Sequence, residues 1–148
     1  MTAAVTLAAL GNGPAFNVYN SSQQSITSST FTKLQFNTEV FDTNNNYDNA
    51  TNYRFTPTVA GYYQFSWYFI PASSTTSSLC RLYKNGIFLY QPFAGNNVTN
   101  SLSGGSALVS MNGSTDYVEV YGYLVGTTPI VESGQNQNLF CGVLVRGA

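Results

Sequence analysis

The segment FNTEVFDTNNNYDNATNYRFTPTVAGYYQFSWYF, residues 36–69, decides the fold class. After Gly61 its residues alternate between two sides of an extended chain. The more apolar side carries Tyr63, Phe65, Trp67 and Phe69, and the other carries Tyr62, Gln64, Ser66 and Tyr68. A period of two is what a half-buried β-strand requires. We therefore predict that Phe65 and Trp67 belong to the core of a sheet protein.

Composition limits the class of protein. The 148 residues suit one domain, and 43% hydrophobic and 15% aromatic residues supply one core. Only 7% of residues are charged, so Asn, Ser, Thr, Gln and Gly must make the surface polar, as suits an extracellular or virion protein. The net charge is −1 and the five Lys and Arg residues are scattered, so we expect no nucleic acid partner.

The pattern of the remaining sequence predicts short strands separated by turns and shows no sustained helical period. Turn signals include Asn85-Gly86, residues 95–97 and Asn112-Gly113. About ten strands at this spacing predict an all-β, two-sheet antiparallel sandwich. The strands are expected near residues 14–20, 31–40, 53–56, 61–70, 77–84, 86–93, 102–111, 116–125, 128–132 and 138–146.

The two cysteines are predicted to be free. Cys80 shares strand parity with Leu82, whereas Cys141 has the opposite parity to Phe140 and Leu144, so the two thiols should point to different faces.

Short motifs in a fixed order connect the chain to a known family. They are Tyr47-Asp48 after an Asn-rich loop, Phe55-x-Pro57, Gly61-x-Tyr63-x-Phe65, Lys84-Asn85-Gly86, Ser103-Gly104-Gly105 and Phe140-x-Gly142-x-Leu144. Together they resemble the globular head of complement C1q and its tumour-necrosis-factor-like relatives. The resemblance covers nearly the whole chain from Ala15-Phe16 and departs at residues 113–118, where the family commonly has a tighter turn. It implies a jelly roll that assembles as a homotrimer.

The resemblance gives residues 14–148 as the C1q-like jelly-roll domain. Residues 1–13 precede it and end in Gly11-Asn12-Gly13, which breaks regular structure. They are expected to be a linker or a docking segment, with a disordered start as the alternative. They lack the roughly 20 apolar residues that crossing a bilayer needs, so no membrane insertion is expected.

Two strands are more apolar than a solitary sandwich needs. One carries a row of tyrosines opposite its apolar face, and in the last strand both faces are apolar. A subunit interface explains both, because a tyrosine combines a large apolar ring with a hydroxyl. The predicted trimer interface contains Tyr117, Tyr121, Tyr123, Leu139, Val143 and Val145. The alternative is an ordinary core with a few exposed tyrosines.

The sequence gives little support for a catalytic site or a metal site. The chain has no histidine, which excludes a Ser/His or Cys/His mechanism, and only distant acids such as Asp48 and Glu132 remain for a carboxylate pair. Residues 42–48 begin like a calcium loop, but Tyr47 replaces the turn glycine and Tyr53 replaces the closing glutamate. We expect no enzyme activity, no cofactor and no metal ligands.

The combination of residues 11–16, 36–42, 53–63 and 140–148 is similar to C1q-like domains of bacteriophage structural proteins. That resemblance implies a tail-fibre, head-fibre or capsid-decoration protein at the virion surface, with other virion proteins and a host-surface glycan or protein as candidate partners. The alternatives are a secreted, extracellular C1q-like binding module and a purely structural trimerisation cap. Target binding is predicted to use polar loops at residues 43–49, 73–78 and 95–100, with Asn44, Asn45, Asn46, Ser74, Thr75, Asn96 and Asn97 as candidate contacts.

Overall fold

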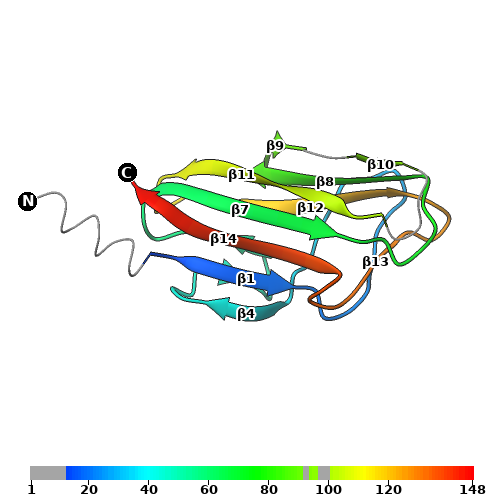
Figure 1. Cartoon of the computed structure of the whole chain (residues 1–148), viewed down its shortest axis with the longest axis horizontal. Helices are drawn as coiled ribbons and strands as arrows, with labels where there is room; N and C mark the ends of the chain where they lie inside the picture. Colours follow the sequence, from blue (N-terminus) through cyan, green and yellow to red (C-terminus); the bar gives the residue numbers. More distant parts are fainter. Residues whose placement is uncertain (1–12, 92–93, 97–100) are drawn as a thin grey trace, which may run out of the picture.

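The computed structural model describes residues 13–91, 94–96 and 101–148 and shows a two-sheet antiparallel sandwich (Figure 1). The first sheet has the order β11 (Ser103–Met111), β7 (Gly61–Phe69), β14 (Asn138–Gly147), β1 (Ala15–Tyr19) and β4 (Thr38–Asp42). The second has the order β10 (Ala94–Asn96), β8 (Ser77–Lys84), β12 (Val118–Val125), β6 (Arg54–Phe55) and β5 (Tyr47–Asp48). In the second sheet β3 (Thr32–Lys33) also pairs with β12, and β9 (Ile87–Tyr90) pairs with β8. Strands β2 (Gln24–Ser25) and β13 (Ile130–Val131) form a separate pair. The all-β sandwich predicted from the sequence is confirmed.

The core lies between the two sheets and is rich in aromatic rings. Phe65 is fully buried and Trp67 is 1% exposed, so the register predicted for β7 is confirmed. The ring of Phe16 from β1 stacks on that of Phe55 from β6 with their centroids 4.3 Å apart, which joins the two layers. Such ring pairs add to the stabilisation that burial of their area provides.

Gly142 on β14 makes room for these rings. A Cβ atom there would lie 2.5 Å from Cδ1 of Phe65 and 2.8 Å from Cε1 of Phe16. Both distances are shorter than two carbon atoms tolerate without a shift. The glycine predicted as part of the Phe140-x-Gly142-x-Leu144 motif therefore has a packing role.

The structure corrects parts of the strand prediction. The strand expected at residues 31–40 is two strands, because the chain leaves the second sheet after Lys33 and joins the first at Thr38. Leu34 and Phe36 are buried at this crossing. The turn expected at residues 95–97 overlaps β10, which pairs with β8, and the short strands β2 and β5 were not predicted.

The cysteine prediction is confirmed. Cys80 is free and buried in the core, whereas Cys141 is free and only half-buried on the opposite side of its sheet. Burial raises the pKa of both thiols.

The start of β1 and the end of β14 lie at the same end of the sandwich (Figure 1). Ala15 pairs with Val143, and Gly147 pairs with the first residue of β7. Within the described residues, no helix is long and apolar enough to cross a membrane.

Candidate functional site: the two outer faces of the sandwich

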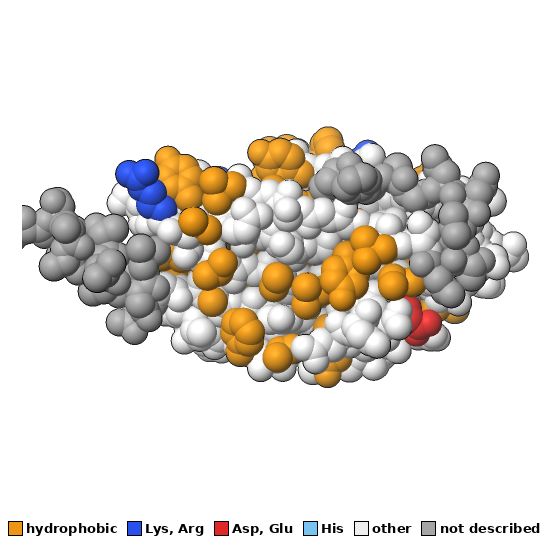
Figure 2. Space-filling view, in the orientation of Figure 1, with side chains coloured by type: hydrophobic (Ala, Val, Ile, Leu, Met, Phe, Trp, Pro, Cys, Tyr) orange, Lys and Arg blue, Asp and Glu red, His pale blue; other side chains and the backbone are white. Residues whose placement is uncertain are grey.

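The outer face of the first sheet carries exposed apolar side chains. They come from β4, β7, β11 and β14 and are Phe41 (47% exposed), Tyr62 (45%), Leu108 (53%), Val143 (46%) and Val145 (48%). Figure 2 shows hydrophobic side chains distributed across this face, with charged side chains only near its margins. Several exposed apolar side chains on one face mark an interaction site more often than a single exposed leucine does.

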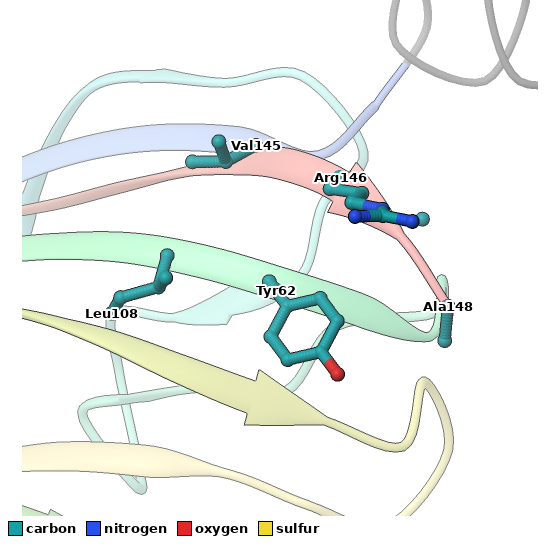
Figure 3. A pocket seen from close by; sticks show the side chains of 6 residues that line it. Tyr62, Leu108, Val145, Arg146 and Ala148 are labelled. Atoms are coloured by element: carbon teal, nitrogen blue, oxygen red, sulfur yellow. The ribbon is translucent and has the colours of Figure 1, made fainter.

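A hollow of about 570 Å³ lies on this face where β14 ends (Figure 3). Leu108 from β11, Tyr62 from β7 and Val145 from β14 border it, together with Arg146 and Ala148. Its border is mainly apolar, so an apolar side chain is the group that it fits best.

The outer face of the second sheet is aromatic and cationic. On β12 the outward side chains include Glu119, Tyr121 and Tyr123, while Val118, Val120 and Leu124 point into the core. The ring of Tyr121 lies 4.3 Å from that of Tyr83 on β8, measured between centroids. The tyrosine row is thus half-covered by side chains of the same chain.

Arg81 lies at the centre of this face, between two rings. Its guanidinium carbon is 3.7 Å from the centroid of Phe31 and 4.5 Å from that of Phe88. Arg54 lies in the same way over Tyr117, at 4.2 Å. A guanidinium group favours such stacking because it is planar and only weakly hydrated.

Glu119 is the carboxylate in the middle of the same face, and it is only 3% exposed. It forms an ion pair with Lys33 and accepts a hydrogen bond of 3.4 Å from the Tyr121 hydroxyl. Burial, and then the negative charge of Glu119, raise the pKa of Tyr121 to about 12, so this hydroxyl keeps its proton at neutral pH.

The residues predicted to form one trimer interface are divided between the two faces. Tyr121 and Tyr123 lie on the outer face of the second sheet, beside Tyr117, whose ring is covered by Arg54. The others lie on the outer face of the first sheet and are Leu139, Val143 and Val145. Since the faces point in opposite directions, the two groups do not form one continuous patch.

The loops predicted to bind a target lie at opposite ends of the sandwich. Residues 43–46 follow β4 at the end where β14 terminates, whereas residues 70–76 follow β7 at the other end (Figure 1). Asn44, Asn45 and Ser74 are exposed, but Asn46 and Thr75 are buried. Asn96 is part of β10, and Asn97 lies outside the described residues.

The two carboxylates of the Asn-rich loop accept hydrogen bonds from backbone amides. Asp42 accepts hydrogen bonds from the amides of Asn44 and Tyr47, at 3.2 and 2.6 Å. Asp48 accepts backbone hydrogen bonds from residues 50–52 and one from the Asn52 side chain. The amide of Thr51 is the largest cause that lowers the pKa of Asp48 to about 2. Both acids therefore act as loop caps, the role that short polar side chains commonly have in turns.

No catalytic arrangement is visible among the described acids. Asp48 and Glu132, the distant pair named from the sequence, border separate hollows. Within the described residues, no three His, Cys, Asp or Glu side chains are grouped as metal ligands would be.

Comparison with known families agrees with this architecture. The C1q domain model matches residues 15–145, which is most of the chain. This protein belongs to the C1q domain family. Among curated proteins, none matches the sequence significantly.

Solved structures show the same fold for this C1q domain. The globular domain of the zebrafish complement 1qA protein is 22% identical, with a TM-score of 0.66, covering 92% of this chain and 99% of the other. The PRD1 vertex protein is 13% identical, with a TM-score of 0.67 and coverage of 90% and 97%. Murine APRIL is 9% identical, with a TM-score of 0.67 and coverage of 90% and 99%. At these identities the likeness concerns the fold alone.

Proposed function

We propose that this C1q domain is a non-enzymatic, homotrimeric binding head at the surface of a virion, where it mediates attachment to a host. In this proposal residues 14–148 form the head and residues 1–13 connect it to another part of the virion. C1q and TNF-like domains are trimeric jelly rolls, and the PRD1 vertex protein, which shares the fold, supports a virion setting.

The observation that carries the trimer is the uncovered apolar face of the first sheet. Phe41, Tyr62, Val143 and Val145 each expose close to half of their surface there. Covering such side chains stabilises an assembly by roughly 25 cal/mol for each Å² removed from water. Charged groups are scarce on this face, which lowers the desolvation cost of covering it.

The contact also needs a second surface on the neighbouring subunit. β11 is the edge strand of the first sheet, and Leu102 just before it is 55% exposed. Ile87 on β9 is 73% exposed but lies beside Lys84, at the other end of β8, so it is not part of the same patch. When one patch of a subunit binds a different patch of the next, the contact is heterologous, and it closes into a ring when the rotation between neighbours is a whole fraction of a turn, as in a trimer. In this proposal the β11 edge of one subunit packs against the first-sheet face of its neighbour.

Two measurements test the proposal. Light scattering on the purified protein at micromolar concentration should give three times the chain mass, and a folded monomer would contradict the trimer. Fluorescently labelled protein should adsorb to cells of a susceptible host. A trimer that adsorbs to no cell type would instead support the structural trimerisation cap.

A further inference from the structure

The outer face of the second sheet brings arginine and aromatic side chains together. We define the cation–aromatic face by the side chains of Phe31, Arg54, Arg81, Tyr83, Phe88 and Tyr121. They come from five separate segments of the sequence and meet on one side of β8 and β12. In a trimer that assembles through the first sheet, this face remains open to solvent.

The two arginines on this face are held in place but keep unused hydrogen-bond donors. Arg81 donates from Nε to the side-chain oxygen of Gln91 at 2.5 Å, and its terminal nitrogens make no hydrogen bond to any described residue. The guanidinium of Arg54 has no hydrogen-bond or ion-pair partner within the described part of the chain. A guanidinium fixed by stacking presents a fork of donors that matches a carboxylate.

The nearby acids are already occupied. Glu119 pairs with Lys33 in the middle of the face. Asp48 lies at the margin, opposite Arg54 in the β5–β6 register, with its oxygens bonded to residues 50–52. Three of the five Lys and Arg residues of the chain are therefore gathered here, and both arginines lack a carboxylate partner. An anionic partner complements this arrangement.

The face also offers rings that a sugar can cover. Phe88 is 47% exposed and lies beside Tyr83, with a centroid distance of 6.1 Å. The β8–β12 and β6–β12 registers place Arg81 and Arg54 on opposite sides of β12, which corresponds to a Cα separation of roughly 12 Å at ordinary strand spacing. Acidic groups repeated along an extended chain span such a distance, whereas a single small anion does not.

We propose that the cation–aromatic face binds a carboxylate-bearing polysaccharide. Arg81 and Arg54 bind two of its carboxylates, and the ring of Phe88 packs against a sugar ring between or beside them. This inference rests on the proposed attachment role and names the ligand class and the surface that serve it.

The test compares arginine variants on matched polymers. Polygalacturonate and alginate, which carry a carboxylate on each sugar, are titrated against the intact trimer by calorimetry, with neutral dextran and with polyglutamate as references. Arg81→Gln and Arg54→Gln remove one charge each without removing the side-chain stem. Arg146→Gln, at the hollow of the first sheet, is the control for a lost positive charge elsewhere, and light scattering first verifies that this variant has the mass of the parent assembly.

We expect both acidic polysaccharides to bind, with affinity that falls as salt increases. Loss of either arginine should weaken binding roughly tenfold to a hundredfold, the usual effect of losing a charge-assisted hydrogen bond. The Arg146→Gln variant should bind as the parent does. Phe88→Ser, which removes an exposed ring, should also weaken binding while leaving the mass of the trimer unchanged.

Several outcomes would overturn the inference. They are an absence of binding to both acidic polysaccharides, equal binding to polyglutamate, and unchanged binding in the two arginine variants. Host-cell adsorption separates this failure from failure of the proposed function. If Arg81→Gln adsorbs to cells as the parent does, attachment stands and the acidic glycan is wrong; if the parent neither adsorbs nor binds polysaccharide, both are wrong.

Discussion

Replacing Val143 by Asp should convert the proposed trimer into folded monomers. The Val143 side chain points away from the core of its own subunit and is 46% exposed, so in a monomer the new carboxylate would stay in water. In the proposed trimer the same position is covered by a neighbouring subunit. The substitution therefore separates assembly from folding.

The size of the effect follows from the exposure of this side chain. Burying a whole valine side chain contributes roughly 1.5–3 kcal/mol, so covering the exposed half contributes about 1 kcal/mol per subunit. A carboxylate buried without a partner costs several kcal/mol more, even after the surrounding protein relaxes. Over three subunits the loss exceeds roughly 10 kcal/mol, which approaches the association free energy of a nanomolar complex.

Sedimentation analysis over a range of protein concentrations is the suitable assay. Val143→Asp should sediment as a monomer at micromolar concentration, with the far-UV circular dichroism spectrum of the parent. Val143→Thr, of similar shape and without charge, should stay trimeric. Tyr121→Ser, on the opposite face of the sandwich, should also stay trimeric. If Val143→Asp dissociates at the same concentration as the parent, this face is not the subunit interface. If Tyr121→Ser dissociates, the tyrosine row is part of the subunit interface.

Three further predictions concern the domain itself. Phe65→Ala should lower the free energy of unfolding by roughly 3–5 kcal/mol, measured by urea denaturation of the monomeric Val143→Asp variant. Tyr62→Ala, on the outer side of β7, should lower it by less than about 1 kcal/mol. Equal effects of the two substitutions would contradict the register of β7. Gly142→Ala should cost about 1–3 kcal/mol in the same assay because its Cβ would meet the Phe65 ring, and a neutral result would show that the ring moves freely. Asp48→Asn should be less stable than the parent at pH 7. Since the folded pKa of Asp48 is lowered to about 2 from 3.8, its contribution is complete above about pH 4 and is lost as the pH falls toward 2, so a difference that does not shrink over that range would contradict the capping role.

The period of two predicted the faces within each strand well. It placed Phe65 and Trp67 in the core and the two thiols on opposite sides of their sheets, because alternation along a strand is a local property. It failed at residues 31–40, where Leu34 and Phe36 keep a core-facing alternation while the chain passes from one sheet to the other. Because the alternation continues through these residues, the sequence does not show where the chain changes sheets.

For the same reason, the predicted interface combined residues from two different faces of the sandwich. Alternation shows that Tyr121 and Val143 both point away from the core, but the sheet that each strand joins depends on pairing between distant segments. The stack of Phe31, Arg81 and Phe88 was not predicted for the same reason. A usable signal was nevertheless present, since Arg81 has the outward parity of β8 and the Asn85-Gly86 hairpin returns Phe88 beside that strand.

The distribution of charge makes one outer face suitable for a subunit interface and the other suitable for binding an anion. A subunit interface removes water from every group that it covers, so an unpaired guanidinium there would destabilise the assembly. On a surface that binds an anion, the same group lowers the free energy of the complex because its partner arrives with the ligand. In a chain with only five Lys and Arg residues, two arginines without a carboxylate partner on one face are therefore informative. Their place on the second sheet argues against that face as the interface between identical subunits, since covering it would remove water from guanidinium groups that have no carboxylate partner. The face of Val143 and Val145 carries Arg146 only at its end, beside the hollow, and it is the one on which assembly is expected.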